Sequence, residues 1–98
     1  MEIIKKVEAE KLTFAIEGRL DSTTAPELDN EVQASIVGVK ELVFDFDKLE
    51  YVSSAGLRVL LSAQKKMNEQ GTMIVTNVDD DIMGIFEVTG FVDILNIQ

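Results

Sequence analysis

Short stretches with the two-residue hydrophobic period of a β-strand alternate along this chain with longer stretches that have the 3.6-residue period of a helix. Strand patterns fall at residues 3–7, 12–16, 42–46 and 73–75, and helix patterns at residues 24–36, 55–69 and 82–90. Residues 42–44 are apolar without interruption, which is typical of a strand buried on both faces of a parallel sheet. The pattern predicts an α/β fold in which helices cover a mixed sheet, with residues 91–97 as its last strand.

The same pattern brings three loops to one edge of the sheet. If the strands near residues 14, 44 and 74 run parallel, the segments that leave their carboxyl ends lie side by side. These segments are residues 19–24, 47–54 and 77–81. Open α/β sheets bind ligands and partners at that edge, so the functional site is expected among these loops.

Two of the predicted helices begin with capping sequences. Residues 24–27 (Thr-Ala-Pro-Glu) fit a capping box, with Thr24 as the N-cap and Pro in the first turn. The three aspartates at 79–81 lack the ligand spacing of a calcium loop, and we interpret them as caps of the third helix. Gly38 stands where a left-handed cap would end the first helix.

Composition removes several classes of function. The 98 residues include 18 acidic and 9 basic side chains, and the net charge is −9. This balance argues against binding to nucleic acid or to an anionic membrane surface, both of which depend on Lys and Arg. The chain has no Cys and no His, which excludes disulfides, thiolate nucleophiles, zinc sites built from them and imidazole catalysis. We expect a cytoplasmic protein without a membrane segment, a metal or a cofactor, and not an enzyme.

Residues 51–57 (Tyr-Val-Ser-Ser-Ala-Gly-Leu) place two serines where the second helix begins. One interpretation is N-capping, which is worth about 1 kcal/mol, and only one serine can occupy the cap. Gly56 costs about 0.8–1 kcal/mol relative to Ala in a helix, so its presence indicates close approach by another group, such as the backbone or active site of a partner. A serine nucleophile would need a base, and His is absent, whereas a serine phosphorylated by another protein needs none. Capping and modification can coexist, since Ser53 and Ser54 are neighbours.

Four blocks of sequence carry a family resemblance. They are Gly18-Arg19-Leu20-Asp21 with Ala25 and Leu28, residues 42–46 (Leu-Val-Phe-Asp-Phe), residues 51–61 and residues 86–91 (Phe-Glu-Val-Thr-Gly-Phe). In these blocks the chain resembles the STAS domain, the fold of bacterial anti-sigma factor antagonists, and the resemblance covers essentially all 98 residues. It implies one domain over residues 1–98, with a mixed sheet of about five strands and helices packed against it.

The resemblance also implies a site. In that family the serine directly before the small–Gly–Leu segment is phosphorylated by the partner anti-sigma factor, which is itself a serine kinase. The matching residue is Ser54. Ser53 is the alternative, and it stands at a position where many members of the family carry Asp. The partner-binding residues would be Asp21, Ser22, Thr23, Ser53, Ser54, Ala55, Gly56, Leu57 and Arg58.

The implied function is a switch between partners. The dephosphorylated protein would bind the anti-sigma factor, which carries ATP and magnesium, and so release the sigma factor. Phosphorylation at Ser54 would end binding, and a phosphoserine phosphatase would reset the protein. The alternative is a constitutive STAS subunit of a lipid-transporting ABC system, which would use the same surface without phosphorylation.

Overall fold

The structure, a computed structural model, describes all 98 residues as five strands, three α-helices and one short 3-10 helix. The strands are β1 (Glu2–Glu8), β2 (Lys11–Leu20), β3 (Glu41–Asp45), β4 (Leu49–Val52) and β5 (Thr72–Thr76). The helices are α1 (Ala25–Ser35), α2 (Ser54–Gln70), α3 (Asp80–Thr89) and the 3-10 helix η1 (Phe91–Asp93). The sheet has the order β1-β2-β3-β5, and β4 pairs with the end of β2. This mixed five-stranded α/β architecture is the predicted fold class.

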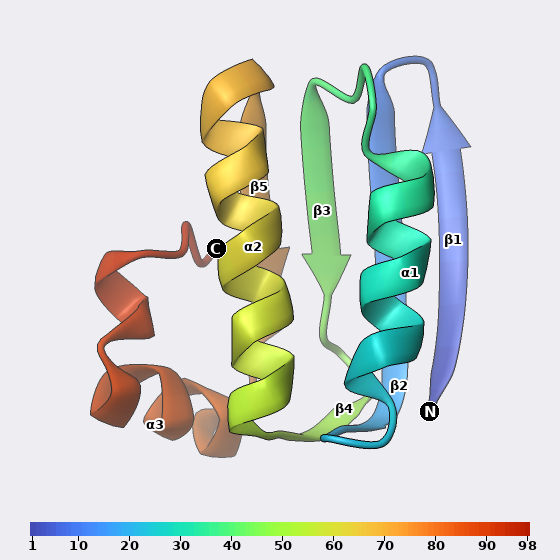
Figure 1. The fold of residues 1–98 in the computed structure, drawn as a ribbon. Coiled ribbons are helices and arrows are strands. Elements are labelled where there is room, and N and C mark those ends of the chain that lie inside the picture. The colour runs from blue at the N-terminus through green and yellow to red at the C-terminus, as the bar shows by residue number, and fades with distance from the viewer.

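Helices α1 and α2 cover the same face of the sheet (Figure 1). β2, β3 and β5 run parallel, and β1 is antiparallel to β2. The apolar stripes of the patterns at 12–16, 24–36 and 55–69 face the core, with the exception of Leu61, which is only partly buried, whereas Ile4 and Val7 of the pattern at 3–7 are exposed. The buried members of these stripes are Leu12, Phe14, Ile16, Ala25, Leu28, Val32, Ile36, Leu57, Leu60 and Met67.

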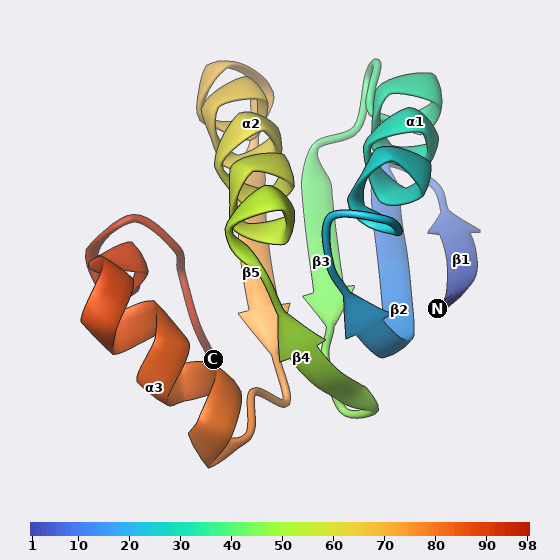
Figure 2. The same ribbon diagram turned by 60° about the horizontal axis from the view of Figure 1, so that its bottom comes forward.

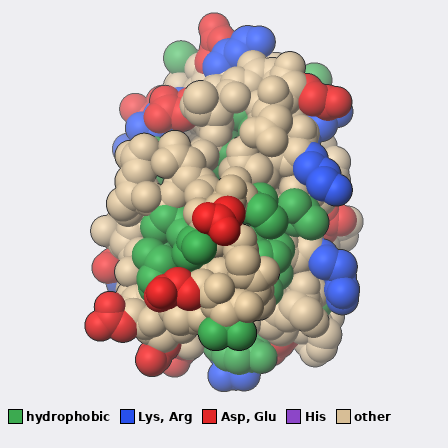
Figure 3. Space-filling view, turned by 90° about the vertical axis from the view of Figure 1, so that its left-hand side faces the viewer, with side chains coloured by type: hydrophobic (Ala, Val, Ile, Leu, Met, Phe, Trp, Pro, Cys, Tyr) green, Lys and Arg blue, Asp and Glu red, His purple; other side chains and the backbone are tan.

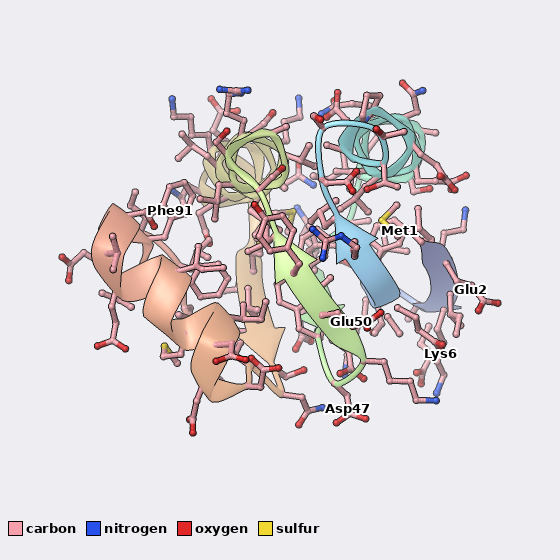
Figure 4. The ribbon with its side chains drawn as sticks, turned by 90° about the horizontal axis from the view of Figure 1, so that it is seen from below. Met1, Glu2, Lys6, Asp47, Glu50 and Phe91 are labelled. Atoms are coloured by element: carbon pink, nitrogen blue, oxygen red, sulfur yellow. The ribbon has the colours of Figure 1, made fainter.

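The opposite face of the sheet under β1, β2 and β3 carries no helix. Seen from below, Asp47 lies on the side away from α1 and α2, and Lys6 lies along the β1 edge (Figure 4). The register explains this, because Lys6 lies opposite Thr13, whereas Lys5 lies opposite the buried Phe14 and reaches α1 through Glu31, 4.0 Å away.

One strand is longer than predicted, and another stands where no strand was predicted. β2 continues to Leu20 instead of giving way to a loop at Gly18, which adopts a φ of +95° within the strand. β4 replaces what was expected to be a connection after β3. Its residues Leu49 and Val52 are buried while the two between them are exposed, so the segment lacks the two-residue alternation of a strand.

The predicted last strand at residues 91–97 is also wrong. This segment begins with η1 and makes only one isolated bridge to the sheet, between Val75 and Ile97. The apolar pattern of this segment suggests burial in a sheet. Val92 and Ile94 are instead exposed, and so is Val88 in α3. α3 lies beside the sheet, away from α1 (Figure 2), and hydrophobic side chains gather around acidic ones on this side of the molecule (Figure 3).

Helices α1 and α3 differ in how their first turns are capped. Asp79 caps α3, as predicted, because its carboxylate accepts a hydrogen bond from the Ile82 N–H at 2.8 Å. The predicted capping box at α1 does not form, because Thr24 has helical backbone angles and makes no side-chain cap bond. Gly38 has a φ of +80°, but it lies two residues beyond the C-cap of α1, Ile36, which is right-handed.

Candidate functional site

β2 and β4 end side by side, and this brings two of the predicted loops together. The two strands pair in parallel, and the Ser53 N–H donates a hydrogen bond of 2.8 Å to the carbonyl of Leu20. Residues 21–24 therefore lie beside residues 53–58, at the edge where α1 and α2 begin (Figure 2). We call residues 21–24 and 53–58 together the Ser54 rim.

The third predicted loop, residues 77–81, lies along the same edge of the sheet but follows β5. The Asn77 side chain donates a hydrogen bond of 2.9 Å to Asp45 at the end of β3. The parallel arrangement of β2, β3 and β5 places all three loops at one edge, as expected. The loop at 77–81 is nonetheless separate from the Ser54 rim, since its polar contacts go to Asp45 and to its own helix.

The two serines have different surroundings. Ser53 is the N-cap of α2, with extended backbone angles, and its hydroxyl accepts a hydrogen bond of 3.4 Å from the Gly56 N–H. Ser54 is the first residue of the helix, is exposed, and makes no side-chain hydrogen bond within the chain. Of the two hydroxyls, only that of Ser53 has a hydrogen-bond partner within the chain.

The close approach at Gly56 comes from the chain itself and not from a partner. A Cβ at this position would lie 2.7 Å from Leu20 Cγ, 2.9 Å from Val52 Cγ2 and 3.0 Å from the Leu20 carbonyl oxygen. Such distances are shorter than van der Waals contact, so only glycine lets α2 sit against the ends of β2 and β4. Gly56 and Leu57 are both buried, so neither presents a side chain at the surface of the rim.

Asp21 organises the loop opposite the serines. Its Oδ1 accepts hydrogen bonds from the N–H groups of Thr23 at 3.0 Å and Thr24 at 3.1 Å. The Thr24 hydroxyl donates to the Arg19 carbonyl at 2.8 Å and accepts from the Asp21 N–H at 2.9 Å. The hydrogen bond from the Thr24 N–H is the main reason why the pKa of Asp21 lies below its ordinary value, with Thr23 and Arg19 adding to the effect.

Arg19 links this loop to β4. Its guanidinium lies 4.3 Å from the centre of the Tyr51 ring, in register across the β2–β4 pair. The same guanidinium lies 3.9 Å from the Asp21 carboxylate. Arg19 is therefore held by a cation–π contact and an ion pair, both at the exposed surface.

A groove of about 350 Å³ runs between the N-terminal halves of α1 and α2, and its lining begins in α2 at Ala55, the residue after Ser54. Arg58 of α2 and Asp29 of α1 both line it, and small side chains keep it open. Sequence reasoning missed Asp29 and Ser62, because the groove exists only once α1 and α2 are packed side by side. Its lining residues are Ser22, Ala25, Pro26, Asp29, Ala55, Arg58, Val59 and Ser62.

The structure thus brings most of the expected site residues to one surface. Asp21, Ser53 and Ala55 are partly exposed there, and Ser22, Thr23, Ser54 and Arg58 are exposed. No helix combines the length and the hydropathy that crossing a bilayer requires.

Comparison with known proteins agrees with the fold. The family model of the STAS domain matches residues 1–98, and the chain belongs to this family. BtrV of Bordetella bronchiseptica, whose name places it among the anti-sigma factor antagonists, is 33% identical over 85% of this chain and 73% of its own length. The anti-sigma-B factor antagonist of Listeria monocytogenes is 28% identical over 97% of this chain and 85% of its own length.

Solved structures agree as well. The anti-sigma factor antagonist SpoIIAA in its unphosphorylated form matches 99% of this chain with a TM-score of 0.79 at 16% identity, and 87% of SpoIIAA is covered. The phosphorylated form of SpoIIAA from Bacillus matches 99% of this chain with a TM-score of 0.78 at 17% identity, and 91% of it is covered. At these identities the likeness concerns the fold.

Proposed function

We propose that this protein is an anti-sigma factor antagonist whose binding is switched off by phosphorylation of Ser54. The unmodified Ser54 rim binds an anti-sigma factor, and the sigma factor is thereby released. The observation that carries the proposal is the exposed, unbonded hydroxyl of Ser54 beside a neighbour, Ser53, that already serves as the helix cap. The names of the relatives BtrV and the Listeria antagonist support the general role.

The phosphoryl transfer asks little of this chain. The anti-sigma factor, acting as a serine kinase, supplies ATP, magnesium and the base. Ser54 Oγ forms a bond to the γ-phosphorus, the bond to the bridging oxygen breaks and ADP leaves, while the hydroxyl proton passes to the kinase base. An accessible hydroxyl on a rigid helix end meets these requirements, and a separate phosphoserine phosphatase resets the protein.

The switch acts between molecules and not within the fold. Phosphorylation adds a charge of about −1.5 to −2 at neutral pH. At the N-terminus of α2 this charge is favoured by the helix dipole, so the helix has no reason to melt. SpoIIAA matches this chain about equally well in its two forms, which supports an unchanged fold. The added bulk and charge therefore act on the partner's contacts with the rim.

Mapping the phosphate tests the proposal. The protein is incubated with the cognate anti-sigma factor and ATP, and the modified residue is identified by mass spectrometry. We expect phosphate on Ser54, loss of labelling in Ser54→Ala and full labelling in the matched variant Ser53→Ala. Labelling that persists in Ser54→Ala and vanishes in Ser53→Ala would overturn the assignment.

A pull-down from the native organism separates this function from that of a constitutive transporter subunit. Recovery of an ATPase of the histidine-kinase type supports the proposal. Recovery of a transporter ATPase, with no labelling of either serine, contradicts it and favours the lipid-transporting ABC system.

A further inference from the structure

Arg58 lies one helical turn after Ser54 on the exposed side of α2. Residues four apart in a helix have Cβ atoms about 5–6 Å from each other. Long side chains in a helix point back toward its N-terminus, over the preceding turn. The guanidinium of Arg58 therefore reaches the space above the Ser54 hydroxyl without any change of the backbone.

Arg58 is also free of competing carboxylates. The three ion pairs of the chain use Lys5, Lys6 and Arg19, and none uses Arg58. Asp29 lines the same groove from α1, yet the two charges do not come within ion-pair distance. Arg19, the cation next to the Asp21 loop, is occupied by Asp21 and Tyr51.

We propose that Arg58 is the phosphate-binding residue of the modified protein, pairing with the phosphate on Ser54 at the mouth of the groove. This inference rests on the proposed function. An acidic group placed four residues before a basic one is the favourable order on a helix, and a guanidinium binds phosphate oxygens through two hydrogen bonds. The pairing neutralises Arg58, the unpaired cation of the groove. It also places the phosphate at the groove entrance, which is open in the unmodified protein.

The test uses protein in which phosphoserine is incorporated at position 54 during synthesis. The second pKa of the phosphate is measured by phosphorus NMR in the otherwise unchanged chain and in Arg58→Gln. Pairing favours the dianion, so we expect Arg58→Gln to raise this pKa by about half a unit, toward the value of about 6 for a free phosphoserine.

Two matched variants separate pairing from the general effect of charge. Lys65→Gln removes a cation from the same helix, 11 residues or about 16 Å from Ser54. Arg19→Gln removes the cation next to the Asp21 loop. We expect the phosphate pKa to change by less than half as much in both as in Arg58→Gln. An unchanged pKa in Arg58→Gln, or an equal rise in all three variants, would overturn the inference.

The outcome is independent of the kinase assay. Because phosphoserine is built in, the titration reports on Arg58 whether or not an anti-sigma factor modifies Ser54. Failure of the proposed function appears instead as absence of labelling at Ser54 in the kinase reaction.

Discussion

Ser53 and Ser54 carry the same side chain, and their surroundings differ in whether the hydroxyl is already hydrogen-bonded. The cap position takes the first hydroxyl, since Ser53 has the extended backbone that an N-cap requires. Ser54, the first residue of the helix, is exposed, and its hydroxyl has no hydrogen-bond partner within the chain. A structural residue thus holds the helix end in place while its neighbour stays available.

This division predicts different costs for two small substitutions. Ser53→Ala removes a cap and is expected to lower the free energy of unfolding by about 0.5–1 kcal/mol, the lower part of the usual range because the 3.4 Å bond is long. Ser54→Ala removes no internal hydrogen bond, so we expect the free energy of unfolding to change by less than about 0.5 kcal/mol. Urea unfolding of both variants checks this, and a greater loss in Ser54→Ala would contradict it.

The lowered pKa of Asp21 gives a prediction for pH. A carboxyl whose pKa is lower in the folded than in the unfolded chain stabilises the fold above its unfolded pKa, and this contribution is lost as pH falls through the folded pKa. Asp21→Ala should therefore be less stable than the unchanged protein at pH 7. The difference should shrink steadily below about pH 4, near the unfolded value.

Unfolding by urea at pH 7, 5, 4 and 3 measures the effect. Asp29→Ala in α1 is the matched control, because the two backbone hydrogen bonds from Thr23 and Thr24 go to Asp21 and none goes to Asp29. A stability difference for Asp21→Ala that stays constant down to pH 3 would show that the carboxylate hydrogen bonds are not its cause.

Among the elements, those with a strong period are the ones that sequence predicts well. The stripes of α1 and α2 bury the expected residues, apart from the partly buried Leu61, because each helix covers the sheet with one face only. The four residues of β4 have no such period, since only the first and the last are buried. Its strand character comes from pairing with β2, a contact between residues about 30 apart that no local pattern contains.

The candidate site divides in the same way. The serines and Asp21 belong to sequence motifs, and the edge they share follows from parallel strands, so both were predictable. The groove was not predictable, because Asp29 and Arg58 line one cavity only through the packing of α1 beside α2. In the sequence, Gly56 indicates a close approach, but the atoms that approach it belong to Leu20 and Val52 of this chain, at strand ends that the local pattern does not predict.

Two glycines within helices provide a matched test of this packing. Gly56→Ala would bring a methyl group within 3 Å of Leu20 and Val52, and we expect a loss of about 1–3 kcal/mol in the free energy of unfolding. Gly84→Ala in α3 meets nothing within 4 Å and should gain about 0.5–1 kcal/mol from helix propensity. Equal gains in both variants would mean that α2 does not need the close approach.

At the scale of the whole molecule, the Ser54 rim is a polar surface on a chain of net charge −9. It is built on the ends of one packed unit, with helices α1 and α2 held against the sheet by a core of 24 buried residues. We therefore expect a charge added at the start of α2 to act on a docked partner and not on the fold.

The phosphorylated protein should accordingly remain as stable as the unmodified one. A dianion at a helix N-terminus contributes about 0.3–1 kcal/mol of stabilisation through the helix dipole. We expect equal helix content by circular dichroism, and an equal or higher urea midpoint, after phosphorylation at Ser54. A lower midpoint with loss of helix signal would mean that modification acts by melting α2.

The affinity of the anti-sigma factor for the two forms of this protein tests the central claim most directly. Isothermal titration calorimetry would compare unmodified protein with protein that is fully phosphorylated at Ser54. The account predicts that phosphorylation weakens binding at least tenfold, or about 1.4 kcal/mol, while unmodified Ser54→Ala binds like the unchanged protein. Equal affinity of the phosphorylated and unmodified forms would contradict it.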